Sequence, residues 1–202
     1  MMAGPRIPAN SVGEREYRDL CAAFARKEIA PRWQEADRER LFPREFYTAA
    51  ARAGLVGVAL PAAVGGADLG ATEEAILLEE CSKANPNLAV ALLVQEVAGG
   101  LLAEFGEGEQ LDLARANIAG DCLLAIAVTE PEAGNDVQNL RTHARRDGAD
   151  WVLSGMKSFI TLGAEADVLV LLAQTEAGGA ACASSRWIGA APGSRRSGSR
   201  RM

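Results

Sequence analysis

The chain has 202 residues, of which 49% are hydrophobic and 24% charged, and its formal net charge at pH 7 is -6. This length and composition allow a substantial buried core, which excludes a disordered polypeptide. The longest apolar runs, at 123–128 and 168–173, are too short for a membrane span, and residues 1–16 lack the apolar core of a secretory signal. We therefore expect a cytoplasmic globular protein without a membrane span.

The first part of the chain has the pattern of helices. Residues 1–10 are expected to form a flexible N-terminus. Ser11 begins a capping box, and apolar residues then recur at helical spacing until Pro31. A second helix is expected over 43–54, followed by a linker over 55–70 that contains too much glycine and proline to be helical.

Two further helices are expected before residue 107. The first covers 72–83 and has acidic residues near its positive end. The second, over 86–106, begins with proline and ends at glycine. Gln95 and Glu96 interrupt its apolar surface, and core packing is preferred over a ligand-lining face as their interpretation.

After Gly120 the periodicity changes to that of strands. The runs CLLAIAVT (122–129) and ADVLVLLAQT (166–175) are short and apolar, and the segment between them contains Asp-Gly and Ser-Gly turn signals. We expect mostly antiparallel strands, arranged as a meander, over 122–174. Such a sheet would pair each strand with its neighbour in the sequence.

Helices followed by strands, without alternation, indicate an α+β multidomain protein and argue against a Rossmann fold. An all-α domain is expected over 11–120 and an incomplete antiparallel β domain over 121–176. The cysteines, at 21, 81, 122 and 182, have no spacing typical of disulfides or metal sites. The only histidine, His143, lies in a charged stretch and is interpreted as a solvated strand residue, so no metal site is predicted.

Two motifs carry a more specific signal. IAVTEPEAGND (126–136) ends an apolar strand in a turn, and SGMKSFITLG (154–163) ends the following hairpin. Together, at this spacing, they resemble the flavin-dependent acyl-CoA dehydrogenase family, and the resemblance covers nearly all of 11–176. It implies an N-terminal helical domain, a middle β domain and a C-terminal helical domain, the last of which is missing from this sequence.

The resemblance also implies a cofactor, FAD, and a reaction. In this family a glutamate removes the α proton of an acyl-CoA thioester while the β hydrogen leaves as hydride to the flavin, and an electron-transferring flavoprotein accepts the electrons. Acyl-CoA and this flavoprotein are therefore the implied partners, and the full-length form is expected to be a homo-oligomer. No catalytic residue is assigned here, because the family's glutamate lies beyond the β domain.

The pyrimidine edge of a flavin carries donors and acceptors that the free backbone groups at a strand end can satisfy. By resemblance, the cofactor-binding residues are Ile126, Ala127, Val128, Thr129, Gly134, Asn135, Phe159, Ile160 and Thr161. Asn135, which stands where the family usually has serine, is also the implied substrate-binding residue. Glu132 replaces a usual glycine and is expected to face solvent, and Phe159 replaces a usual tryptophan.

Two classes of function stay open. The chain is either the N-terminal part of an FAD-dependent acyl-CoA dehydrogenase, inactive by itself and holding FAD weakly, or a non-catalytic remnant or interaction module. Acyl-CoA oxidases and flavin monooxygenases are alternatives for the parental chemistry.

Residues 177–202 differ from the rest of the chain. They contain five arginines and no acidic residue, and we expect them to be unstructured. Back-translation of 181–188 allows a shifted frame that reads LRLFPVD, so a frameshift and a genuine basic tail are both open. The acidic body offers no matching basic face, so nucleic acid is not expected as a partner.

Overall fold

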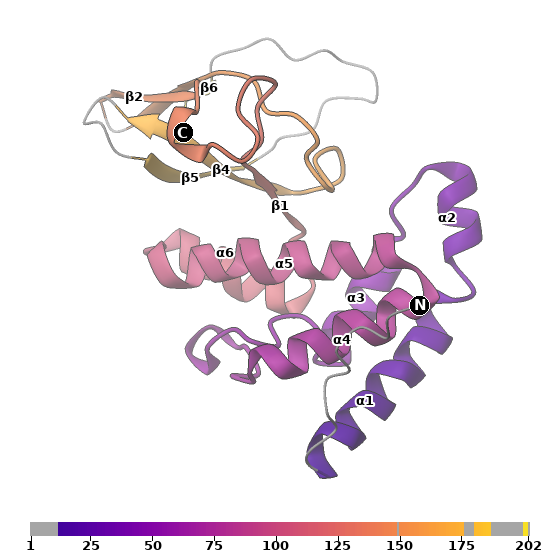
Figure 1. Ribbon diagram of the computed structural model, residues 1–202. Coiled ribbons are helices and arrows are strands. Elements are labelled where there is room, and N and C mark those ends of the chain that lie inside the picture. Colours follow the sequence, from indigo (N-terminus) through magenta and orange to yellow (C-terminus); the bar gives the residue numbers. More distant parts are fainter. Residues whose placement is uncertain (1–11, 149, 176–179, 187–199, 202) are drawn as a thin grey trace. The chain divides into compact units, whose positions relative to one another are not determined.

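A computed structural model describes residues 12–148, 150–175, 180–186 and 200–201 (Figure 1). The chain divides after Asp121 into a helical unit and a sheet unit. The expected flexible N-terminus and the Ser11 cap lie outside the described residues.

The helical unit is built from six α-helices and two short turns of other helix types within its described part. These are α1 (Val12–Phe24), the π-helical turn η1 (Ala25–Ile29), α2 (Trp33–Glu39), α3 (Arg44–Arg52), the 3-10 turn η2 (Ala62–Val64), α4 (Ala71–Ala84), α5 (Pro86–Phe105) and α6 (Glu109–Ala119). The predicted helices over 43–54, 72–83 and 86–106 are confirmed as α3, α4 and α5. Helix α2 has no predicted counterpart, because none of its residues is buried and it has no apolar stripe to reveal it.

Helix α5 begins and ends where its sequence signals place it. The Asn85 side chain accepts a hydrogen bond from the backbone N–H of Leu88 at 3.0 Å, and Pro86 is the first helical residue. The helix has the length and apolar composition of a membrane span, but 56% of its most apolar window is buried in the structure. Its apolar character therefore fits a core helix.

Gln95 and Glu96 of α5 belong to the core of the helical unit, as the preferred interpretation predicts. Glu96 is 6% exposed, and its carboxylate accepts hydrogen bonds from the backbone N–H groups of Gly57, Val58 (2.9 Å) and Ala59 (3.2 Å). Gln95 accepts a bond from the Asn117 amide on α6 at 2.8 Å. Glu96 thus fixes the irregular linker between α3 and α4, whose N–H groups have no helical partners there.

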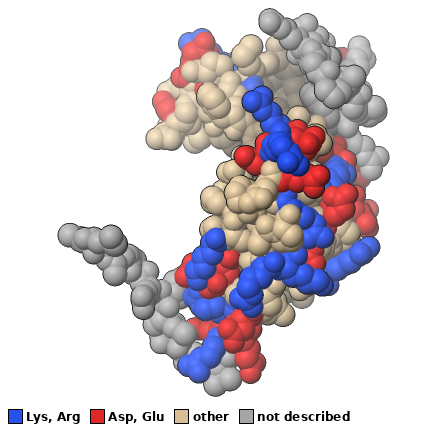
Figure 2. All heavy atoms as spheres, turned by 90° about the vertical axis from the view of Figure 1, so that its right-hand side faces the viewer, with Lys and Arg blue, Asp and Glu red and all other residues tan. Residues whose placement is uncertain are grey.

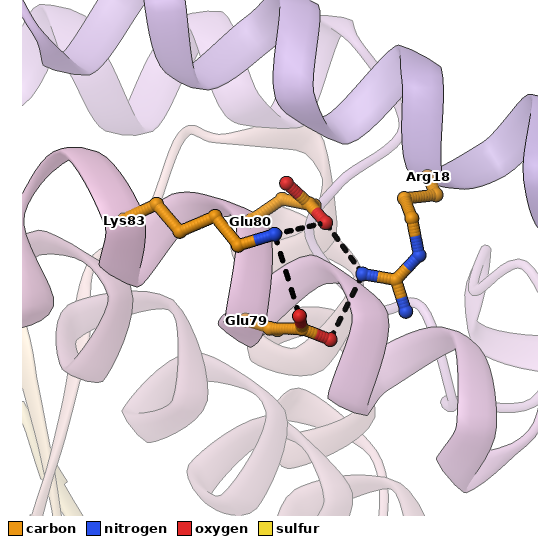
Figure 3. A network of polar contacts seen from close by, with 4 residues as sticks. All are labelled: Arg18, Glu79, Glu80 and Lys83. Atoms are coloured by element: carbon orange, nitrogen blue, oxygen red, sulfur yellow. Dashed lines mark hydrogen bonds and ion pairs between the residues drawn. The ribbon is translucent and has the colours of Figure 1, made fainter. Parts of the chain in front are cut away.

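Helices α1 and α4 are joined by a network of ion pairs (Figure 3). Arg18 on α1 bonds Glu79 at 2.8 Å and Glu80 at 2.5 Å, and Lys83 bonds the same two carboxylates at 3.3 Å and 2.7 Å. The Glu80 side chain is 7% exposed, so this network is partly shielded from solvent. On the face shown in Figure 2, basic and acidic side chains are interspersed over the helical unit.

The sheet unit contains β1 (Leu124–Ala127), the 3-10 turn η3 (Val137–Asn139), β2 (His143–Asp147), β3 (Asp150–Ser154), β4 (Val168–Thr175), β5 (Ala180–Arg186) and β6 (Arg200–Arg201). Strand β4 is the centre of this sheet. It pairs in parallel with β1 and β2, and antiparallel with β5. Strand β3 pairs antiparallel with β2 and β6.

The register shows that β1 and β2 follow one another along the same edge of β4. Strand β1 pairs with 168–171 and β2 with 174–175, while β5 occupies the opposite edge over 168–174. The expected antiparallel meander is therefore wrong for β1: the sheet is mixed, and β1 does not pair with β2. The long turn after β1 carries the chain past the end of that strand, so β2 enters the sheet in line with it. The predicted hairpin of β2 and β3 is confirmed.

The expectation of an unstructured tail differs from the structure at 180–186, which forms β5 against the apolar strand β4. Pairing there satisfies the backbone groups on the second edge of β4. The tail residues 177–179, 187–199 and 202 lie outside the described residues.

Glu96→Ala is expected to lower the free energy of unfolding by about 3 kcal/mol, because two buried backbone N–H groups and one partly buried one lose their acceptor. Urea unfolding followed by far-UV circular dichroism measures the loss. Glu104→Ala, on an exposed position of the same helix, is the control and should change stability by less than about 0.5 kcal/mol. Equal effects of the two substitutions would contradict the assigned role of Glu96.

The stability contributed by Glu96 should depend on pH. Burial raises the pKa of Glu96 above its ordinary value of 4.5, although three backbone N–H groups oppose this shift. A raised folded-state pKa means that the folded protein binds the proton more tightly, so its contribution is complete below 4.5 and is lost as pH rises through the folded pKa. As pH falls from neutral to 4.5, the free energy of unfolding of the wild type should therefore increase relative to that of Glu96→Gln. A difference in unfolding free energy that is constant over this range would refute the prediction.

Candidate functional site

The first motif forms a tight turn directly after β1. The N–H of Glu130 donates to the carbonyl of Ala133 at 2.9 Å, and the N–H of Ala133 donates back at 3.3 Å. Pro131 and Glu132 at the tip are exposed. Glu132 faces solvent as predicted, has no positive φ, and pairs with Arg141 at 3.3 Å.

The Glu130 side chain is buried, with 4% exposure, and several donors share its carboxylate. Oε2 accepts from the N–H of Arg141 at 2.6 Å, and Oε1 accepts from the N–H of Thr142 at 2.9 Å. The Lys157 ammonium donates to the same Oε1 at 2.8 Å and to the carbonyl of Val128 at 2.8 Å. One side chain therefore joins three separate segments of backbone.

Burial by itself would raise the pKa of Glu130, but the Lys157 ammonium and the backbone N–H groups outweigh it and lower this pKa to about 2. A carboxylate with so low a pKa is a poor proton acceptor at neutral pH. This low pKa therefore argues against a catalytic role of Glu130 as a base.

The second motif is held against the first. The N–H of Ser158 donates to the carbonyl of Thr129 at 2.9 Å, next to the Lys157 contact with Val128. Gly155 allows the segment to start there, because a Cβ on this residue would lie 2.4 Å from Oγ1 of Thr142. The structure thus brings together the two motifs on which the resemblance rests.

Phe159 and Ile160 have opposite environments. Phe159 is 95% exposed and has a φ of +57°, an uncommon backbone conformation for a bulky residue. Ile160 instead packs on the sheet core formed by Ala127, Ala144, Leu171 and Ala173. Ile160 therefore anchors the loop, while Phe159 presents its ring outward.

The predicted residues at the end of β1 also differ in their environments, since some are paired or buried and others have free hydrogen-bonding groups. Ile126 and Ala127 pair with β4, and the Ala127 side chain is fully buried. The expectation that the carbonyls of Val128 and Thr129 are free is wrong, because they accept from Lys157 and Ser158. The Thr129 hydroxyl and N–H have no hydrogen-bond partner in the described part of the chain, which leaves them available to a ligand.

Gly134, Asn135 and Thr161 are exposed. A Cβ added to Gly134 would meet no atom of the described chain within 4 Å, so the packing of this chain does not require glycine there. Close approach of a ligand to the backbone is one reason for a glycine at such an open position.

These features fit the pyrimidine and ring surfaces of a flavin. Thr129 offers donors to its polar edge, Phe159 offers an aromatic surface, and Gly134 leaves space beside the backbone. These residues could therefore hold the FAD that the resemblance implies, which would supply a hydride acceptor.

Motif reasoning missed the residues that hold this site together. It gave Glu130, Lys157 and Gly155 no role in the site. A partial signal was present in the sequence: Lys157 is the only charged residue of the second motif, and the first motif contains Glu130, Glu132 and Asp136 as acidic residues with which it could pair. Ion pairing across them could have been proposed on that ground.

The histidine and the buried cysteines of the described chain form no further catalytic or metal site. His143 is exposed on β2, as predicted, with Nδ1 2.5 Å from the carbonyl of Arg141. Within the described ranges, no group of three or more histidine, cysteine or acidic side chains could hold a metal ion. Cys21 and Cys81 are buried in the helical unit, and burial raises the pKa of their thiols to about 11 and about 12.

The sequence matches two family models. Residues 12–114 match the N-terminal domain of acyl-CoA dehydrogenase, and residues 125–191 match its middle domain. The second match continues beyond Glu176, and with the pairing of β5 it favours counting residues up to 191 as part of the middle domain.

Individual proteins agree with these matches. Cyclohex-1-ene-1-carbonyl-CoA dehydrogenase of Geobacter metallireducens is 37% identical over 78% of this chain and 42% of its own length. Glutaryl-CoA dehydrogenase from Mycobacterium smegmatis is 29% identical with a TM-score of 0.82, over 88% of this chain and 46% of the other. A glutaryl-CoA dehydrogenase from the same organism in complex with FADH2 is 26% identical with a TM-score of 0.82, over 87% of this chain and 46% of the other.

The chain spans less than half the length of these relatives. Its fold, a helical unit followed by a small mixed sheet, and its two joined motifs agree with the family matches. The chain therefore belongs to the acyl-CoA dehydrogenase family.

Proposed function

We propose that this chain binds FAD at the end of β1 and forms part of an enzyme that desaturates acyl-CoA thioesters. The observation that carries the proposal is the exposed Phe159, held in a left-handed backbone conformation beside the end of β1. An exposed aromatic ring in a conformation of this kind is costly unless a ligand uses it. The complex of a related glutaryl-CoA dehydrogenase with FADH2 supports the choice of cofactor.

Each residue has a defined task in this proposal. Thr129 donates hydrogen bonds to the polar edge of the cofactor, and Phe159 covers part of its ring surface and excludes water. Gly134 permits close approach of the backbone, and Asn135 contacts the substrate with its exposed amide. Fixed donors of this kind stabilise negative charge in a site from which water is excluded.

The substrate and the electron acceptor follow from the family. We propose an acyl-CoA thioester as the substrate, an electron-transferring flavoprotein as the acceptor, and a homo-oligomer as the assembly. The low pKa of Glu130 and the three hydrogen bonds that its carboxylate already accepts argue against it as the proton acceptor. Oxygen consumption during turnover distinguishes this dehydrogenase from an acyl-CoA oxidase or a flavin monooxygenase.

Titration of the 202-residue chain with FAD tests cofactor binding. We expect saturable quenching of flavin fluorescence, with weak affinity because the aromatic face is open to solvent. Phe159→Ala should raise the dissociation constant about tenfold, equivalent to about 1.4 kcal/mol of aromatic contact. Met156→Ala, on an exposed position of the same loop, is the control. Absence of FAD binding by the wild type, or equal affinity of Phe159→Ala, would contradict the proposal.

A pair of glycine substitutions separates folding from cofactor binding. Gly134→Ala should leave thermal stability unchanged, because its Cβ meets no atom within 4 Å, yet raise the FAD dissociation constant roughly fivefold. Gly155→Ala should lower the free energy of unfolding by about 2 kcal/mol or more, because its Cβ overlaps Thr142. Thermal melts and FAD titrations measure the two effects. Unchanged FAD affinity in Gly134→Ala would place the cofactor away from this turn.

A further inference from the structure

We propose that Glu130 and Lys157 are positioning residues of the flavin site: their buried ion pair holds the loop that carries Phe159 against the end of β1. This inference rests on the proposed function and extends it, because the charged groups of both residues are buried. Both act through the backbone segments to which they are bonded.

The contacts of the pair connect every irregular segment of the site. The Glu130 carboxylate accepts hydrogen bonds from the two backbone N–H groups that precede β2. The Lys157 ammonium donates to the carbonyl of Val128 at the end of β1. The next residue after Lys157, Ser158, donates its N–H to Thr129. Phe159 therefore follows directly on two consecutive residues that are tied to the strand end.

The burial of the pair makes these contacts strong. The side chains of Lys157 and Glu130 are 7% and 2% exposed, and Nζ lies 2.8 Å from Oε1. Removal of one partner of such a pair leaves an uncompensated buried charge, which the surrounding backbone must move to hydrate. The segments bonded to the pair are the ones that would move.

The core of the sheet does not need this pair. One of its hydrophobic clusters consists of Ala127, Ala144, Leu171 and Ala173, and the strands pair through registers that do not include Glu130 or Lys157. Loss of the pair should therefore release the two motif loops while the strands stay paired. A residue with a merely structural role would instead loosen strands and loops together.

The chain provides a matched control on a neighbouring pair. Glu132 and Arg141 also join the first motif to the residues before β2, at 3.3 Å, but their side chains are 58% and 71% exposed. An exposed pair of this kind contributes little. Arg141→Met removes it and leaves the backbone N–H that Glu130 accepts.

Amide hydrogen exchange of the full chain without FAD tests the proposal. In Lys157→Met, exchange of the Ser158 amide should rise by at least about tenfold, since a charge-assisted contact next to it is lost. Exchange in β2 and β3 should stay within about twofold of the wild type. Arg141→Met should match the wild type throughout. Unchanged exchange at Ser158, or an equal rise in the strands, would overturn the positioning role.

A conservative variant separates charge from packing. Lys157→Arg keeps the cation and should restore slow exchange at Ser158, whereas Lys157→Met keeps the aliphatic length only. Should Lys157→Met fail to fold, Glu130→Gln, which retains an acceptor of the same size, gives the same comparison. Failure of Lys157→Arg to restore exchange, with Lys157→Met affected, would count against the ion pair as the cause.

FAD titration of the same variants links the pair to the cofactor. We expect the FAD dissociation constant to rise about tenfold in Lys157→Met and to stay unchanged in Arg141→Met. If the wild type binds no FAD, the proposed function fails, while the exchange measurements still decide the positioning role. If the wild type binds FAD and Lys157→Met binds it equally well, the positioning role fails and the proposed function stands.

Discussion

Buried carboxylates that accept backbone N–H groups are the interaction on which both units depend. Irregular segments leave N–H groups without ladder partners, and each such group is costly when buried. Glu96 accepts three of them from the linker before α4, and Glu130 accepts two from the segment before β2. In each case one side chain fixes a stretch of backbone that neither helix nor sheet could hold.

The two carboxylates differ in their charged neighbours, and their pKa values shift in opposite directions. At Glu96 burial outweighs the three backbone N–H groups that lower the pKa, and no basic side chain in the described part of the chain assists them, so the pKa is raised. At Glu130 the Lys157 ammonium and the backbone donors prevail over burial and lower the pKa to about 2. Glu130 therefore stays ionised wherever the protein is folded at ordinary pH. The sheet unit gains a fixed charge pair, whereas the helical unit carries a carboxylate whose pKa burial raises.

Sequence patterns predicted what depends on local physics. Helical spacing, the proline that begins α5 and the apolar run of β4 are each encoded within a few residues, and they agree with the structure. The in-line placement of β1 and β2 on β4 depends on pairing between residues far apart in sequence, which no local pattern specifies. Helix α2 was not predicted because none of its residues is buried, so its sequence carries no apolar pattern.

The candidate site shows the same division more sharply. Motif resemblance groups Phe159 with Ile160, because they are neighbours in the second motif. The structure separates them: Ile160 anchors the loop in the sheet core, and this anchoring allows Phe159 to be held 95% exposed with a positive φ. An unfavourable conformation persists only where surrounding contacts over-determine it. Those contacts come from Ser158, Lys157 and Ile160, so the exposed ring is a consequence of its buried neighbours.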